Sequence, residues 1–234
     1  MGREVVKIMT SRGCHVTVIG RREPNSQDRE IANADFHLVD IQDEAATKKV
    51  LSKAISVNGK LNYLVFCHRY RGEEDPWAGE IDVSLYATKY IVEFVSESFE
   101  EDGDKSIVFV SSVFGDFVGE GQQVSYHVGK AGLNQLMRFY AVNLGRKGIR
   151  VNAITPFTFL KEESKQFYLK NEKLMSLYKD IVPLGRISTS EDNANVVGFL
   201  CSPEACFISG QNIYIDGGLS LVWQETLARM LADV

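Results

Sequence analysis

The feature that most constrains the fold of this sequence is the alternation of apolar, strand-like segments with longer segments of helical character. The strand-like segments are residues 15–20, 34–40, 61–67, 106–112, 149–155 and 212–218. Between them, residues 43–59, 80–99 and 125–147 carry apolar side chains at helical spacing. Strands that are apolar throughout are typical of a parallel sheet buried on both faces. The sequence therefore predicts a three-layer, doubly wound α/β fold, with residues 1–234 forming one domain.

Composition and charge narrow the classes of function. A net charge of −5 over 234 residues argues against binding to nucleic acid or to an anionic membrane surface. No apolar run approaches the ~20 residues of a membrane span, and no signal peptide opens the chain. Cys14, Cys67, Cys201 and Cys206 show no metal-ligand spacing. We therefore expect reduced thiols, no metal site and a cytoplasmic location.

The sharpest chemical signal is a serine followed by a tyrosine–lysine pair. Tyr126 and Lys130 are four positions apart in an expected helix, so they lie on one face of it. A free phenol has a pKa of about 10 and is a poor acid or base at neutral pH, but a nearby ammonium favours the phenolate. Ser112 ends the preceding strand-like segment, where its hydroxyl can hold a substrate oxygen. The Tyr–Lys spacing alone also occurs on ordinary amphipathic helices, so the flanking residues carry the argument.

The flanking segments "SSVFG", "AGL" and "GIRVNAITP" resemble those of the short-chain dehydrogenase/reductase family. The resemblance covers nearly all of residues 2–219, including "PLGRISTSEDNANVVGFLCSPEACFISGQNIYIDGG" near the C-terminus. It implies a Rossmann-like fold and an oxidoreductase that transfers a hydride between NAD(P) and a small carbonyl or secondary alcohol substrate. By this resemblance, Ser112 would align the substrate oxygen and Tyr126 would transfer the proton. Lys130 would lower the tyrosine pKa and hold the nicotinamide ribose.

The first residues of the chain resemble the end of the family's glycine-rich turn and the helix that follows it. Residues 3–12 have a helical pattern and lead directly into the strand-like segment at residue 15. Of the cofactor fingerprint only Gly2 remains, and the family's first strand is missing from the sequence. Losing a central strand would expose two neighbouring edges. We therefore expect a chain trimmed at its start; a functional protein without that strand is the alternative.

The remaining cofactor contacts are predicted at strand ends. Gly20 stands where NAD-preferring family members place an acidic residue, and Arg21 and Arg22 follow it. Guanidinium groups suit a 2′-phosphate, which favours NADPH over NADH, although a charged surface loop is an alternative interpretation. Asp40 matches the family's adenine-contacting acid, a solvated carboxylate being the alternative. The other expected cofactor contacts are Ile41, Cys67, Lys130, Pro156 and Phe159.

Several positions depart from the family pattern. "FCHR" (66–69) replaces N-N-A-G, and Phe157 replaces the glycine of a P-G dipeptide. The Asn that often completes a catalytic tetrad falls at Ser84, which can hold a water molecule but not with an amide's geometry. We interpret His68 and His127 as packing or surface residues. These departures keep a second hypothesis open: a relative without turnover that serves as a cofactor-binding or structural subunit.

Two segments stand apart from the strand–helix alternation. Residues 156–183 form a polar insertion after a strand and are a candidate substrate lid, and residues 219–234 form a tail. Family members pair through two long helices, here 80–99 and 125–147, and the second carries an apolar stripe: Leu133, Leu136, Met137, Tyr140 and Leu144. The tail has a stripe of its own: Trp223, Leu227, Met230 and Leu231. We expect a homodimer or homotetramer whose tail borders a subunit interface, or alternatively a tail that folds back on its own subunit.

Overall fold

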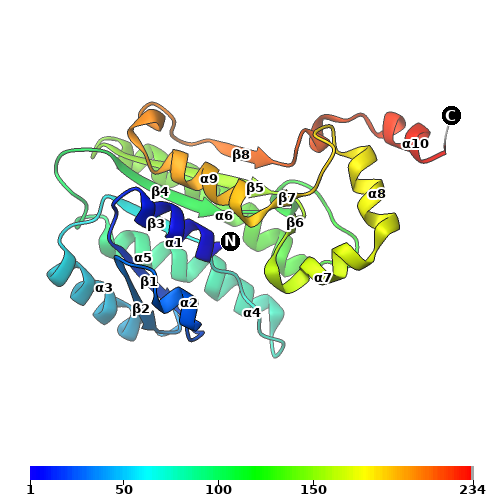
Figure 1. Ribbon diagram of the computed structural model, residues 1–234. Helices are drawn as coiled ribbons and strands as arrows, with labels where there is room; N and C mark the ends of the chain where they lie inside the picture. The colour runs from blue at the N-terminus through cyan, green and yellow to red at the C-terminus, as the bar shows by residue number, and fades with distance from the viewer. Residues whose placement is uncertain (233–234) are drawn as a thin grey trace.

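Parallel strands lie between two layers of helices in the computed structural model, which describes residues 1–232 (Figure 1). The strands are β1 (Val16–Gly20), β2 (Ala34–Leu38), β3 (Tyr63–Phe66), β4 (Lys105–Val110), β5 (Ile149–Pro156), β6 (Phe159–Leu160), β7 (Ser188–Thr189) and β8 (Asn212–Ile215). The α-helices are α1 (Gly2–Ser11), α2 (Ser26–Arg29), α3 (Glu44–Asn58), α4 (Pro76–Glu80), α5 (Ala87–Val95), α6 (Val124–Gly145), α7 (Glu162–Lys170), α8 (Glu172–Ile181), α9 (Ser190–Leu200) and α10 (Gln224–Ala232). Each strand expected from the sequence is present, and the doubly wound α/β fold is confirmed.

The principal strands form two separate parallel sheets. β3, β4, β5 and β8 are hydrogen-bonded neighbours in that order, while β1 pairs with β2. In the registers, Phe109 is opposite Ala153 and Val18 is opposite Phe36. Within residues 1–232, no further strand pairs with the outer edge of β3 or with the edge of β1 opposite β2. The family resemblance places a strand between these two edges.

The side chains of β4 alternate between two hydrophobic cores, one on each face of the four-stranded sheet. Ile107 and Phe109 pack with α5 and α6, whereas Val108 and Val110 pack with α1 and α9. Helices α1 and α9 lie side by side (Figure 1). Because successive side chains of a strand point to opposite faces, a strand with no polar face needs helices on both sides. The apolar run "IVFV" therefore accounts for the three layers.

The helix expected at residues 80–99 has different bounds and is not uniform. The Asp75 side chain accepts hydrogen bonds from the backbone N–H groups of Trp77 and Ala78, and Pro76 stands at the first helical position. These two features start α4 before the predicted residue. The chain then passes through a π-helix, η1 (Ile81–Tyr86), before α5 ends at Val95. The prediction of one helix over 80–99 was therefore wrong in its bounds, and π-segments of this kind are frequent at functional sites.

The insertion after β5 forms two helices, α7 and α8, beyond the ends of the strands. The arrowheads of β4, β5 and β8 point toward this region (Figure 1). β6 and β7 pair in parallel next to it. The Tyr178 ring contacts those of Phe157 and Tyr168, with centroid distances of 6.1 and 6.3 Å. These aromatic side chains of the insertion therefore pack on one another.

The apolar stripe of α6 faces the core of its own subunit. Leu133, Met137, Tyr140 and Leu144 belong to the core cluster on the α5–α6 side of the sheet. Expecting this stripe to pair with a second subunit was therefore wrong, because a doubly wound sheet already buries it. The large apolar side chains that α6 exposes are Val124, Val128, Phe139 and Val142, at 66%, 39%, 57% and 77%.

The tail contains α10, which contacts α8 (Figure 1). Trp223 is 69% exposed, Met230 46% and Leu231 62%. Residues 233–234 of the expected tail lie outside the described residues. Within residues 1–232, none of the helices combines the length and the apolar character that crossing a bilayer requires.

Candidate active site

Tyr126 and Lys130 lie near the start of α6, beside the end of β4. The Lys130 Nζ atom is 5.5 Å from the centre of the Tyr126 ring. It donates a hydrogen bond to the backbone oxygen of Val110, the last residue of β4, at 3.1 Å. Lys130 is only 2% exposed. The structure thus buries a cationic side chain next to a phenol, at the end of the sheet where doubly wound folds bind ligands.

Ser112 approaches this pair from the turn that follows β4. Its hydroxyl accepts a hydrogen bond from the backbone N–H of Phe114 at 3.3 Å, which caps the 3₁₀ turn η2 (Val113–Gly115). The hydroxyl also lies close enough to the Tyr126 phenol to act on its pKa. Ser112, Tyr126 and Lys130 are therefore together in space, although the chain separates the serine from the tyrosine by a loop.

The electrostatics of Tyr126 differ from the sequence-based expectation. Burial raises the pKa of its phenol; the Ser112 hydroxyl and the Arg69 guanidinium act to lower it, and the Glu80 carboxylate adds to the rise. Burial also lowers the pKa of Lys130 to about 8, against the opposing influence of Glu80. The sequence led to the expectation of a lowered tyrosine pKa, but in this structure burial outweighs the Ser112 hydroxyl and the Arg69 guanidinium, so the pKa of Tyr126 rises.

Ser84 lies one helical turn after Glu80 and donates a hydrogen bond to its carboxylate. Ser84 is 1% exposed and Glu80 4%. Burial raises the pKa of Glu80, while the Ser84 hydroxyl and the Lys130 ammonium act to lower it. The Ser84 hydroxyl is therefore hydrogen-bonded to a buried carboxyl group, and that carboxyl group acts to raise the pKa of Lys130.

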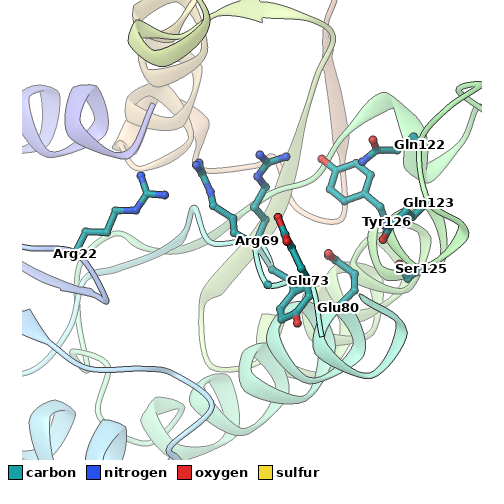
Figure 2. Close-up of a pocket in the computed structure, with 11 residues that line it drawn as sticks. Arg22, Arg69, Glu73, Glu80, Gln122, Gln123, Ser125 and Tyr126 are labelled. Atoms are coloured by element: carbon teal, nitrogen blue, oxygen red, sulfur yellow. The ribbon is translucent and has the colours of Figure 1, made fainter. Parts of the chain in front are cut away.

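The two arginines after β1 have different surroundings. Arg21 forms an ion pair with Asp40, with Nη1 and Oδ2 3.5 Å apart. Arg22 makes no ion pair with any carboxylate of residues 1–232. Its side chain instead lines a cavity of about 380 Å³ that also contains Tyr126. Figure 2 shows Arg22 and Arg69 reaching this cavity from one side and Tyr126, Gln122 and Gln123 from the other.

The other predicted cofactor residues surround the ends of β2, β3 and β5. Gly2 opens α1 so close to Cys67 that a Cβ atom on the glycine would be 3.7 Å from that of the cysteine. Burial raises the pKa of the Cys67 thiol to about 11. Pro156 ends β5 and Phe159 begins β6. The Ile41 side chain is partly buried and packs against the hydrophobic core.

Two histidines near the site have structural contacts. A ring nitrogen of His68 is 3.1 Å from the Thr88 hydroxyl, and burial lowers the pKa of this imidazole to about 4. His127 accepts a hydrogen bond from the backbone N–H of Gly119 at 3.0 Å. In the described part of the chain, no cluster of three or more His, Cys, Asp or Glu side chains is arranged to hold a metal ion.

Three charged residues that share the cavity with Tyr126 were not predicted from the sequence as site residues: Arg69, Arg71 and Glu80. The first two stand in "HRYRGEEDP", directly after a strand. A basic pair at the end of a parallel strand, where ligands bind, was a usable signal. Glu80 gave no signal, because its importance comes from its burial and from the fold that places it against α6.

The chain is similar over most of its length to known reductases and dehydrogenases. A family model described as "Enoyl-(Acyl carrier protein) reductase" matches residues 1–220. A tropinone reductase homologue of Arabidopsis thaliana is 29% identical, over 94% of this chain and 87% of its own. The 3-oxoacyl-[acyl-carrier-protein] reductase FabG of Escherichia coli (strain K12) is 26% identical, over 95% and 93%. A solved short-chain type dehydrogenase/reductase from Mycobacterium ulcerans superposes with a TM-score of 0.82 at 26% identity, covering 94% of this chain and 86% of that one.

Proposed function

The chain belongs to the short-chain dehydrogenase/reductase family and is an NAD(P)-dependent oxidoreductase, and on that premise we propose that it reduces a small carbonyl compound with NADPH. The observation that carries this proposal is the convergence of Ser112, Tyr126 and Lys130 at the end of β4. A cavity opens directly on Tyr126. The reverse reaction, oxidation of a secondary alcohol, uses the same groups.

The proposed roles follow from the position and charge of each group. Tyr126 donates its phenolic proton to the carbonyl oxygen, and Ser112 donates a hydrogen bond to the same oxygen. The raised pKa of Tyr126 keeps the phenol protonated at neutral pH, which suits the reductive direction. Lys130 supplies positive charge beside the tyrosine, and Ser84 holds Glu80, whose carboxylate favours the charged form of Lys130.

The residues around this cluster fit a nicotinamide cofactor. An ammonium has three N–H donors, and Lys130 has one acceptor within residues 1–232, the Val110 oxygen. The remaining donors can serve the ribose hydroxyls. The Arg22 guanidinium is free for a 2′-phosphate, with the Arg21–Asp40 pair beside it. When bound, NADPH supplies the hydride that the carbonyl carbon receives.

The rest of the cofactor would be held at the ends of the strands. Gly2, Cys67, Pro156 and Phe159 border that region, and Ile41 would contribute through its backbone, since its partly buried side chain packs against the core. We also propose that residues 156–183 act as a lid. α7 and α8 lie beyond the strand ends (Figure 1), where their closure would exclude water from the reacting groups.

A conservative substitution tests the proposal. Tyr126→Phe removes the proton donor and little contact area, so turnover should fall by roughly 10²- to 10⁴-fold while NADPH binding stays within a few-fold. Binding is followed by NADPH fluorescence and turnover by loss of its absorbance. Tyr86→Phe is the matched control, because Tyr86 is 51% exposed and its hydroxyl contacts Glu44. A Tyr126→Phe enzyme that retains most of its activity would refute the assignment.

A further inference from the structure

We propose that the substrate is a short oxo acid, whose carboxylate is held by Arg69 one or two carbons away from the carbonyl group that Tyr126 protonates. The inference rests on the proposed function and specifies its substrate. It concerns the cavity that Arg69 and Tyr126 share (Figure 2).

The wall of this cavity is made mainly of polar and charged side chains. The lining residues are Arg22, Arg69, Tyr70, Arg71, Gly72, Glu73, Glu80, Gln122, Gln123, Ser125 and Tyr126. None of them has an aliphatic side chain. Ligand sites are usually lined mainly by apolar side chains, and a long acyl chain would need such a wall. This cavity instead suits a small, polar ligand.

The charged side chains of the cavity wall are three arginines and two glutamates. Three guanidinium groups, those of Arg22, Arg69 and Arg71, face it, and none forms an ion pair within residues 1–232. Burial and the repulsion of Arg69, Arg22 and Arg21 lower the pKa of Arg71. Two carboxylates also line the cavity, Glu73 and Glu80. Glu80 is already engaged by the Ser84 hydroxyl and by the charge of Lys130.

A set of unpaired guanidinium groups is matched by an anion, because each can donate two parallel hydrogen bonds to a carboxylate or phosphate. Arg22 stands after β1, where the cofactor phosphate is proposed to lie. Arg69 stands after β3 and acts directly on the Tyr126 phenol. The two arginines therefore serve different anions.

The shared cavity and the direct influence of Arg69 on Tyr126 favour a short substrate. One atom of the ligand, its carbonyl oxygen, must meet the tyrosine hydroxyl, and its anion must meet the adjacent guanidinium. Hydrogen bonds to both groups are about 2.7–3.0 Å long, so only a short bridge connects carbonyl and carboxylate. A 2-oxo or 3-oxo acid meets this condition, whereas the phosphates of a carrier-bound thioester lie many bonds from its carbonyl.

The reaction balances without any further reactant. The carbonyl carbon gains the hydride of NADPH, the π bond to oxygen breaks, and the oxygen takes the proton of Tyr126. The nicotinamide is oxidised, the substrate is reduced to a hydroxy acid, and a solvent proton restores the tyrosine. The carboxylate is unchanged and keeps its contact with Arg69 throughout.

The test compares acetoacetate with methyl acetoacetate, which has the same carbonyl group but no negative charge. The wild-type enzyme should prefer the acid in kcat/KM. Arg69→Gln should lower kcat/KM for the acid by on the order of 10- to 100-fold more than for the ester, because the influence of Arg69 on Tyr126 is lost with both substrates and the charge-assisted pair only with the acid. Arg146→Gln is the matched control, because Arg146 is an exposed arginine at the far end of α6.

A binding measurement makes the result independent of turnover. Malonate, which has two carboxylates and no reducible carbonyl, should bind to the wild-type enzyme in calorimetry and lose that binding in Arg69→Gln. An enzyme that reduces the ester as well as the acid overturns this inference and leaves the proposed function standing. The inference is also overturned if Arg69→Gln weakens NADPH binding instead. If no carbonyl compound is reduced, the proposed function fails, and malonate binding alone then decides whether Arg69 forms an anion site.

Discussion

The side chain of Glu80 occupies the space that a side chain at Gly129 would need. A Cβ atom on Gly129 would lie 2.9 Å from Glu80 Cγ and 3.2 Å from Oε1. Gly129 directly precedes Lys130 on α6. The glycine therefore allows a buried carboxyl group to approach the helix that carries the tyrosine and the lysine.

The position of Glu80 against α6 should control the pH range in which the enzyme is active. The Glu80 carboxylate favours the ammonium form of Lys130, whose pKa burial lowers to about 8. Glu80→Gln removes that opposing charge, so Lys130 should lose its proton at lower pH. We expect the alkaline limb of the kcat/KM profile to move down by roughly one pH unit. Glu73→Gln, which removes a carboxylate from the same cavity, is the control, and an alkaline limb that does not move would show that Glu80 has no influence on Lys130.

A substitution at Gly129 should disturb the same contact from the other side. Gly129→Ala places a methyl group against Glu80 and should lower the free energy of unfolding by about 1–3 kcal/mol, the usual cost of overpacking. Glu80→Ala in the same chain should recover part of that loss, because the methyl group then has room. Urea unfolding of the two single variants and the double variant measures the coupling. Independent, additive effects would contradict the predicted contact.

The two arginines after β1 should contribute unequally to cofactor choice. Arg22 has no ion pair within residues 1–232, whereas Arg21 already pairs with Asp40. Arg22→Ala should therefore raise the KM for NADPH by on the order of 10- to 100-fold, the value of a charge-assisted contact to phosphate. Arg21→Ala should have a smaller effect, and neither should change the KM for NADH. Equal losses for the two cofactors would remove the case for NADPH preference.

The exposed apolar side chains of α6 and of the tail predict an oligomer. Phe139 and Val142 are 57% and 77% exposed on a helix through which relatives were expected to pair. We expect a dimer or tetramer in light scattering, and Phe139→Glu should dissociate it by placing a charge in the interface. Lys165→Glu, on α7, controls for the change of charge. Removal of residues 221–234 tests the tail, and an unchanged mass would leave it without an interface role.

A buried ion pair should contribute strongly to stability. The guanidinium of Arg150 in β5 makes two hydrogen bonds from Nη2 to Asp104, at 2.8 and 3.0 Å, and their side chains are 8% and 13% exposed. Asp104→Ala leaves the arginine buried without its partner, so the free energy of unfolding should fall by about 3–5 kcal/mol. Removing an exposed pair by Glu225→Ala should cost less than about 1 kcal/mol. Chemical denaturation of both variants provides the comparison.

The sequence predicted the fold well because the relevant signals are local. The apolar run of β4 and the helical spacing of residues 125–147 are each visible in one short segment. It predicted Ser112, Tyr126 and Lys130 as a group because a family motif contains all three. Arg69 and Glu80 belong to segments that only the tertiary structure brings to Tyr126. Net pKa shifts, such as the rise for Tyr126, depend on burial, which the order of residues alone does not give.

The division of the sheet has a consequence for the dynamics of the protein. Within residues 1–232, the β1–β2 ladder shares no strand pairing with β3, β4, β5 or β8; it joins them through side chains such as Val16 and Ile19. A ladder attached in this way can open while the four-stranded sheet stays intact. Its amide protons should therefore exchange with solvent sooner than those of β4. Arg21 and Arg22 follow β1 directly, so an anion bound to them would hold β1 and β2 in their paired state. The amide protons of these two strands would then exchange more slowly, and their exchange rate would report whether the anion site is occupied.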